Sequence, residues 1–366
     1  MKTSALAIAI STALGWSIVA PSAWAQTVPE NLKGSGEVIV TSGGGAWEAA
    51  QRKAFFEPFT RDTGIKVVVV PQDDGKMLAS VKLGQPAADI TEINGGSLPT
   101  WVNKSAAEEI DYSLFGKDTL KGVPDYLKSK YGVGAVIFSL NVAYNTKVFS
   151  ETNAPRNWVD FYNVDAYPGK RGLPKCESML NGGLLETALL GDGVSPQALY
   201  PLDVERAFAK ITKMKPNVGR WWVAGADAPQ SLVSGEVDMA ASYNGRIISA
   251  KKQGAPLALS WDQALLQYDY WVVLKDAPNK ENAFKFLAYI SQAKPQAAFS
   301  TEIPYGPINS DAFALLSKDL VEALPGAPER KGKEIPQNYE WWGQTQADGR
   351  TNYELALERC VSILSQ

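Results

Sequence analysis

The alternation of short apolar segments with amphipathic ones constrains the fold of this 366-residue chain more than any other feature. Residues 37–42, 65–70 and 88–93 are largely apolar, as expected of buried strands. Residues 47–59 and 75–83, which lie between them, repeat apolar side chains at helical spacing. This order of strands and helices predicts a parallel sheet with crossover helices.

The same alternation resumes after residue 132. We expect strands at 133–140, 218–223, 237–243 and 268–274, and helices at 182–190, 203–214, 229–234 and 282–291. No internal repeat and no long linker separates the two halves of the chain. We therefore expect two α/β lobes that are joined by several short crossings.

The first 25 residues have the pattern of a cleavable signal peptide. Lys2 gives the positive start, residues 5–20 are almost wholly apolar, and Ala23-Trp24-Ala25 is a small-x-small cleavage site. No later run approaches the roughly 20 apolar residues that a bilayer span needs, and the first cysteine is Cys176, too far along to carry a lipid anchor. We expect an exported periplasmic protein.

The composition excludes several classes of function. The chain contains no histidine, which excludes Ser-His-Asp and Cys-His catalysis and His-ligated zinc. The net charge of −3, without a block of Lys or Arg, argues against nucleic acid as a partner. We expect no cofactor, but a secreted hydrolase that uses carboxylates alone stays open, since such pairs are spatial rather than sequential.

Two cysteines, Cys176 and Cys360, are the only ones in the chain. In an oxidising compartment a disulfide bond is the leading interpretation, and two separate buried thiols are the alternative.

Another local feature is the glycine run at 43–45, which lacks the Gly-Lys-Ser/Thr ending of a phosphate loop. It predicts a tight turn, whose N–H groups could line a ligand cleft.

Five segments, in the same order and spacing, resemble the solute-binding proteins of bacterial ABC importers, in particular the spermidine/putrescine-binding family. They are the Phe55, Phe59 and Gly64 segment, Lys215-Pro-Asn-Val218, Gly235-Glu-Val-Asp238 with Tyr243-Asn-Gly245, Ala277-Pro-Asn-Lys-Glu281, and Tyr305-Gly-Pro-Ile-Asn309. The resemblance implies the α/β, type II-like fold of a periplasmic binding protein. Each lobe would be a mainly parallel sheet flanked by helices, with the ligand cleft between the lobes.

The resemblance also implies lobe boundaries and a partner. Lobe 1 would comprise residues 36–141 and 272–309, and lobe 2 residues 142–271 and 310–366. The end of the chain would then pack on the second lobe, where Cys176 lies. The protein would be a monomer that binds a small molecule, closes around it and delivers it to an inner-membrane ABC permease.

Carried position by position, the resemblance implies eight ligand-binding residues: Trp47, Asn94, Gly95, Ser97, Tyr243, Arg246, Asp269 and Tyr305. Asp269 matches a carboxylate that pairs with an amine. The acidic pair of the family falls near Glu177 and Asn181, so one carboxylate is missing here. The ligand is expected to carry an amine, either as a polyamine such as putrescine or spermidine or, given Arg246, as an amino-carboxylate.

Overall fold

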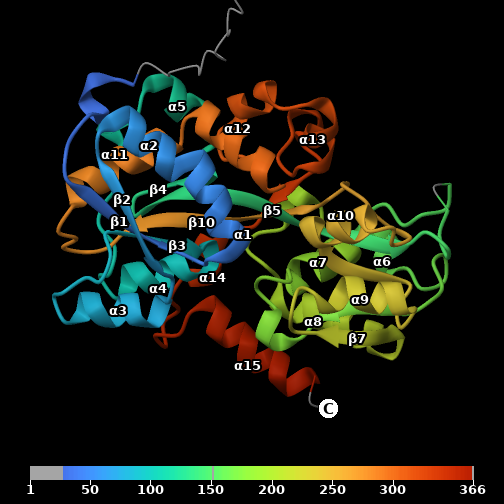
Figure 1. Ribbon diagram of the computed structural model, residues 1–366. Helices are drawn as coiled ribbons and strands as arrows, with labels where there is room; N and C mark the ends of the chain where they lie inside the picture. Colours follow the sequence, from blue (N-terminus) through green and yellow to red (C-terminus); the bar gives the residue numbers. More distant parts are fainter. Residues whose placement is uncertain (1–27, 151, 365–366) are drawn as a thin grey trace, which may run out of the picture.

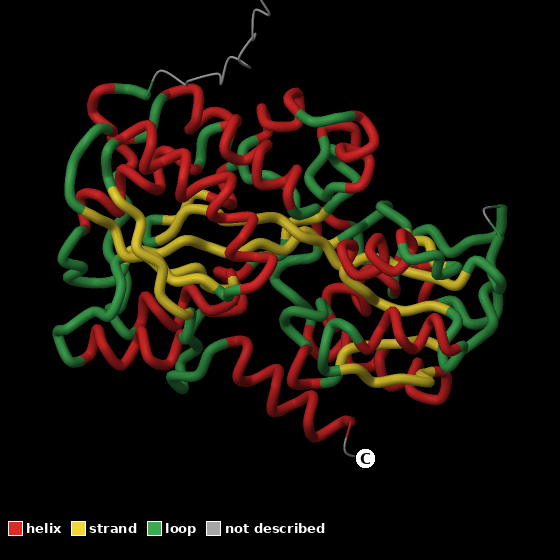
Figure 2. Tube along the Cα trace, in the orientation of Figure 1, coloured by secondary structure: helices red, strands yellow, loops and turns green. Residues whose placement is uncertain are grey.

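The computed structural model describes residues 28–150 and 152–364, so the predicted signal peptide lies outside the described part. Two lobes lie side by side and share one twisted sheet (Figures 1 and 2). The strand order is β2-β1-β3-β10-β5-β8-β6-β7, with β4, β9 and β11 attached to the central strands. The expected two-lobed α/β fold is confirmed.

The first lobe begins with β1 (Glu37–Ser42), which pairs in parallel with β2 (Lys66–Pro71) and β3 (Ile90–Asn94). A long helical segment joins β1 to β2, made of α1 (Gly45–Gln51), a π-helical turn (Arg52–Phe56) and α2 (Glu57–Thr63). Gly64 ends it with a φ of +85°, a left-handed conformation that glycine adopts without strain. The remaining helices of this lobe are α3 (Asp74–Lys82), α4 (Leu98–Asn103), α5 (Lys117–Gly122), α11 (Lys280–Ile290), α12 (Ala293–Glu302) and α13 (Lys318–Ala323).

Two long antiparallel strands, β5 (Gly132–Asn145) and β10 (Leu265–Val273), cross between the lobes. In the first lobe β10 pairs with β3, and in the second β5 pairs with β8. The short strands are β4 (Lys128–Ser129), β9 (Leu257–Leu259) and β11 (Ile335–Pro336). The pairing of these two strands therefore determines which side chains of the first lobe lie near those of the second.

The second lobe repeats the parallel pattern, again with three strands. β6 (Arg171–Pro174) pairs in parallel with both β7 (Val218–Trp222) and β8 (Met239–Tyr243). Its helices are α6 (Trp158–Tyr162), α7 (Leu184–Gly191), α8 (Val204–Met214), α9 (Asp227–Ser234) and α10 (Asn244–Lys252). All eight residues of α7 are buried, which places it at the centre of this lobe.

The C-terminal segment contacts both lobes. The 3-10 turn at Ser310–Leu315 contacts α12, whereas we expected residues 310–366 in lobe 2. Pro325 O lies 2.6 Å from where a Cβ on Gly306 would stand, which shows how closely the segment packs on the first lobe. Next, α14 (Tyr339–Gly343) contacts α4 of the first lobe.

The last helix, α15 (Asn352–Leu364), returns to the second lobe and contacts α8. The predicted disulfide is confirmed: Cys176 and Cys360 are bonded, with their Cα atoms 5.7 Å apart. Thr351 and Glu354 form a capping box at the helix start, in which Glu354 N donates to Thr351 Oγ1 over 3.2 Å and Thr351 N donates to Glu354 Oε2 over 2.8 Å.

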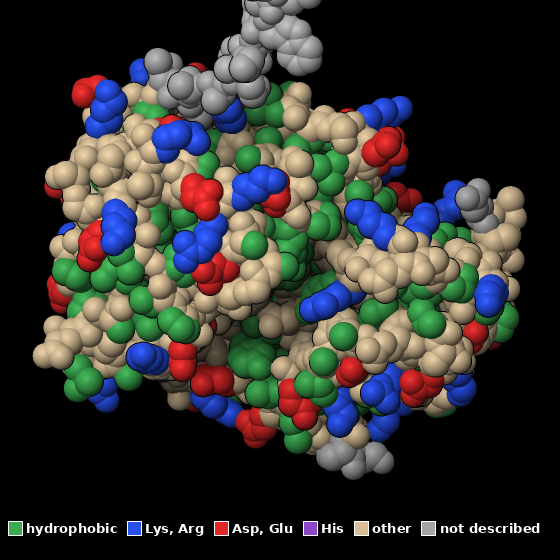
Figure 3. All heavy atoms as spheres, in the orientation of Figure 1, with side chains coloured by type: hydrophobic (Ala, Val, Ile, Leu, Met, Phe, Trp, Pro, Cys, Tyr) green, Lys and Arg blue, Asp and Glu red, His purple; other side chains and the backbone are tan. Residues whose placement is uncertain are grey.

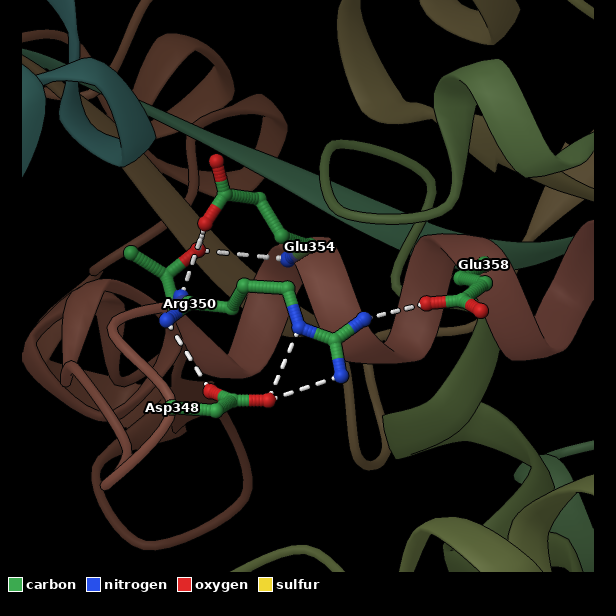
Figure 4. A network of polar contacts seen from close by, with 5 residues as sticks. Asp348, Arg350, Glu354 and Glu358 are labelled. Carbon is green, nitrogen blue, oxygen red and sulfur yellow. Dashed lines mark hydrogen bonds and ion pairs between the residues drawn. The ribbon is translucent and has the colours of Figure 1, made fainter.

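An exposed ion-pair network surrounds this helix start (Figure 4). Arg350 donates to Asp348 Oδ2 over 2.9 Å through Nε, and it reaches Glu358 one turn into α15. Because these side chains are solvent-exposed, the network contributes little to stability. The buried disulfide therefore holds α15 more firmly than this network does.

Candidate functional site

A cavity of about 1320 Å³ opens between the two lobes. Its first wall comes from α1, the end of β3 and the loop after α12, and its second wall from α9 and α10. Phe138 of β5 and Asp269 of β10 join these walls from the crossing strands. Figure 3 shows the hollow between the lobes, with hydrophobic side chains inside it and a cationic side chain at its edge.

Six of the eight predicted site residues line this cavity: Trp47, Asn94, Tyr243, Arg246, Asp269 and Tyr305. Gly95 and Ser97 do not, because they turn into a 3-10 helix at Gly95–Ser97 that packs against the C-terminal segment. A Cβ on Gly95 would stand 2.4 Å from the ring of Tyr339. Gly95 is therefore required for packing, and it reaches the site only through its N–H group.

Aromatic rings form a continuous wall that spans the two lobes. The rings of Trp47 and Tyr305 meet edge to face with their centroids 5.0 Å apart. Phe138 lies 6.4 Å from Tyr305 and 5.9 Å from Tyr243, so it links the two tyrosines. These geometries are favourable for aromatic pairs, and the exposed ring faces can contact an apolar chain or a cation.

Glu92, near the end of β3, is a buried carboxylate in the cavity wall that the sequence did not single out. Its Oε2 atom accepts hydrogen bonds from Trp47 Nε1 over 3.1 Å and from Gln51 Nε2 over 3.0 Å. Its Oε1 atom is buried without any hydrogen-bond partner. Burial, and then the nearby charge of Asp269, raise the pKa of Glu92 well above its ordinary value.

Asp269 is the second carboxylate of the site and projects from β10. Burial raises its pKa to about 7, although hydrogen bonds from Asn94 and from the Gly95 N–H oppose that rise. Asn94 Nδ2 donates to Asp269 Oδ1 over 3.2 Å, and these two residues are direct partners in the β3–β10 ladder. The site thus contains two carboxylates that are poorly compensated.

Arg246 lies in the first turn of α10, on the opposite wall of the cavity. It is exposed, and within residues 28–150 and 152–364 it makes no hydrogen bond or ion pair. It is close enough to Tyr243 and Tyr305 to oppose the rise in pKa that burial causes in both phenols. A free guanidinium therefore faces the two carboxylates across the cavity, and guanidinium groups bind carboxylates well.

Glu177 and Asn181, near which the acidic pair of the family falls, do not contribute a carboxylate to the cavity. Glu177 is exposed and lies outside the cavity lining. Asn181 lies behind the site, where its backbone oxygen accepts hydrogen bonds from the Tyr243 hydroxyl over 2.9 Å and from Gln267 Nε2 over 2.7 Å. These bonds fix the orientation of the Tyr243 ring.

Two further findings concern metal binding and membrane crossing. In the described part of the chain, no cluster of three or more acidic, histidine or cysteine side chains could hold a metal ion. No helix among the same residues has the length and apolarity that a membrane crossing requires.

Comparisons with known proteins agree with the resemblance to solute-binding proteins that the sequence implies. The family of bacterial extracellular solute-binding proteins matches residues 54–329. The γ-aminobutyric acid-binding protein of Pseudomonas aeruginosa is 41% identical over 315 residues, which cover 84% of this chain and 87% of that protein. Spermidine/putrescine-binding periplasmic protein 1 of Haemophilus influenzae is 26% identical, over 75% of this chain and 77% of that protein.

A solved structure supports the fold. The ABC transporter substrate-binding protein from Bradyrhizobium japonicum superimposes with a TM-score of 0.78 at 33% identity, covering 90% of this chain and 99% of that one. The resemblance inferred from the sequence is therefore confirmed at the level of the family and the fold.

Proposed function

Because this chain belongs to the bacterial extracellular solute-binding proteins, we propose that it captures a small amino-carboxylate for an ABC importer. The observation that carries the proposal is the placement of opposite charges on the two walls of one cavity. Asp269 and Glu92 offer acceptors for an ammonium group, and Arg246 offers a donor fork for a carboxylate. A short chain between the two charged ends would lie along the aromatic wall.

The similarity to the γ-aminobutyric acid-binding protein favours this class of ligand over a polyamine. A polyamine would bring a cationic group toward Arg246, which is a like charge without a carboxylate partner of its own. The similarity to the spermidine/putrescine-binding protein is weaker, at 26% identity. γ-Aminobutyrate is therefore the probe we would test first, with putrescine and spermidine as the alternatives.

The remaining parts of the proposal follow from the family. Residues 1–25 would direct export to the periplasm and be removed there. The liganded protein would act as a monomer and dock on an inner-membrane permease, and ATP hydrolysis would belong to another subunit. A carboxylate-dependent hydrolase is set aside, because the family to which the chain belongs is one of binding proteins.

Calorimetric titration of γ-aminobutyrate, putrescine and spermidine tests the proposal. We expect γ-aminobutyrate to bind best and to be recovered unchanged. Arg246→Ala should weaken its binding by roughly 2–5 kcal/mol, because the ligand carboxylate would be left without a partner. Arg220→Ala is the matched control, since Arg220 is a surface arginine of the same lobe. Tight binding of putrescine that Arg246→Ala does not change would overturn the amino-carboxylate assignment.

A further inference from the structure

The cation-binding side of the cavity contains an unused acceptor. Glu92 is only 4% exposed, and both of its hydrogen-bond donors, Trp47 and Gln51, share its Oε2 atom. Oε1 is buried and unpartnered, although Glu92 lines the cavity. A buried acceptor that receives no hydrogen bond carries a free-energy cost, which is larger for a charged group. A group that binds there would recover this cost.

The register of the sheet places Glu92 beside Asp269. Asp269 stands directly opposite Asn94 in the antiparallel β3–β10 pair. Glu92 precedes Asn94 by two residues, so its side chain lies on the same face of the sheet and diagonal to Asp269. Diagonal neighbours are ~7–8 Å apart, which long side chains can bridge. The two carboxylates therefore form one pair, and one cation can contact both.

No cation stands beside this pair in the described residues. Glu92 is faced from α1 by Trp47 and Gln51, which are neutral. The charged or titratable groups that act on Asp269 or Glu92 from the surrounding elements are Asp74 of α3, Tyr243 at the end of β8, Tyr305 after α12, and Tyr339 of α14. Arg246 of α10 acts on Tyr243 and Tyr305 from the second lobe.

Two neighbouring carboxylates, Glu92 buried and Asp269 half-buried, cannot both ionise cheaply without a counter-ion. Burial already raises the pKa of Asp269 to about 7, and burial and Asp269 together raise that of Glu92. Near neutral pH the empty pair consequently carries a proton for part of the time. An incoming ammonium would supply the missing positive charge instead.

We propose that Glu92 and Asp269 form a single ammonium subsite that holds a proton while the cleft is empty and releases it to solvent when the ligand binds. The inference rests on the proposed function, because it needs a ligand that bears an ammonium group. In this exchange one carboxyl O–H bond breaks and its proton goes to water. The ammonium keeps its own protons, and no other bond changes.

Proton release links affinity to pH. A ligand that favours the deprotonated pair binds more tightly as the pH rises, and by reciprocity it lowers the affinity of the pair for its proton. Affinity for γ-aminobutyrate should rise with pH up to neutrality, by at most about tenfold per unit for one proton. It should level off once the pH exceeds the pKa values of both carboxyl groups.

Calorimetry in buffers of different ionisation enthalpy counts the protons directly. At pH 7 we expect γ-aminobutyrate to release roughly half a proton or more, and this number should fall as the pH rises above 7. Glu92→Gln should bind at least about tenfold more weakly and should release fewer protons, since it leaves a single carboxylate without the repulsion of its neighbour. A merely structural role for Glu92 would not change the dependence on buffer.

The controls separate the possible outcomes. Glu57→Gln removes an exposed carboxylate of α2 and should leave both affinity and proton release unchanged. If Glu92→Gln does not fold, Asp269→Asn tests the same pair. Binding of γ-aminobutyrate to the native protein at pH 7 without proton release would overturn this inference and leave the proposed function intact. Failure of γ-aminobutyrate, putrescine and spermidine to bind would overturn both.

Discussion

Asp269 costs the empty protein stability whenever its carboxyl group is ionised. Its pKa is raised to about 7 in the folded chain, against about 4 in an unfolded one. The folded protein therefore holds this proton more tightly than the unfolded chain does. The resulting contribution to the free energy of unfolding is fully present below pH 4 and is lost as the pH rises through 7.

Asp269→Asn should remove that dependence. We expect the unliganded variant to melt several degrees above the native protein at pH 8, because the native carboxylate is then ionised and the amide is not. The difference should shrink as the pH falls from 8 to 5, and the two melting temperatures should converge below pH 4. Thermal unfolding of both proteins across this pH range measures the difference. A difference that is constant from pH 5 to pH 8 would show that Asp269 does not titrate in this range.

The family resemblance pointed to Tyr243, Arg246 and Asp269, and all three line the cavity. That they bind the ligand stays a prediction. Glu92 was not predicted as a site residue because it is a polar residue in a largely apolar strand, and no local sequence pattern indicates that Asp269 lies beside it. Its pairing with Asp269 joins positions 177 residues apart (269 − 92) and arises from the register of β3 on β10.

Among the helices and strands, α7 carries a buried acid, Glu186, which ties the second lobe to the C-terminal segment. Glu186 is fully buried, and its Oε1 accepts hydrogen bonds from Gln337 Nε2, Trp342 Nε1 and the Tyr200 hydroxyl over 2.8–2.9 Å. Trp342 belongs to α14, which contacts α4 of the first lobe. This cluster therefore holds the two lobes together behind the cleft.

Glu186→Ala should lower the free energy of unfolding by about 2–4 kcal/mol, because it leaves the buried Trp342 N–H and Tyr200 O–H groups without their acceptor. Denaturant titration of the unliganded protein gives this value. Glu177→Ala, at an exposed position of the same lobe, should change it by less than about 0.5 kcal/mol. Equal effects of the two substitutions would exclude a structural role for the Glu186 cluster.

Most elements could be predicted from periodicity because their burial is regular. The strands and helices that we expected lie within about five residues of the observed ones, and the helix expected at 47–59 corresponds to α1, the π-helical turn and α2, which ends at Thr63. The path of the C-terminal segment could not be predicted. After residues 310–315, which contact the preceding α12, the chain brings α14 against α4, which lies far earlier in the sequence, and no local pattern indicates this contact.

For the whole molecule, the placement of charge makes closure depend on the ligand. The carboxylate pair lies on the first lobe and on β10, whereas Arg246 lies on the second lobe. A molecule with an ammonium at one end and a carboxylate at the other can satisfy both lobes at once, and so favours the closed state by its differential contacts. A simple alkylamine can satisfy only the first lobe.

Small-angle X-ray scattering should detect this difference. Saturating γ-aminobutyrate should reduce the radius of gyration, whereas saturating butylamine should leave it near the unliganded value. Arg246→Ala should bind γ-aminobutyrate without the full reduction. An equal reduction by both ligands would mean that the ligand carboxylate does not drive closure.

A crystal structure of the native protein with γ-aminobutyrate tests the central claim most directly. We predict closed lobes, with the ligand nitrogen within hydrogen-bond distance of both Asp269 and Glu92 and its carboxylate paired with Arg246. The ligand chain should lie against Trp47 and Tyr305. A ligand bound in the reverse direction, or one that leaves Arg246 in solvent, would contradict the account.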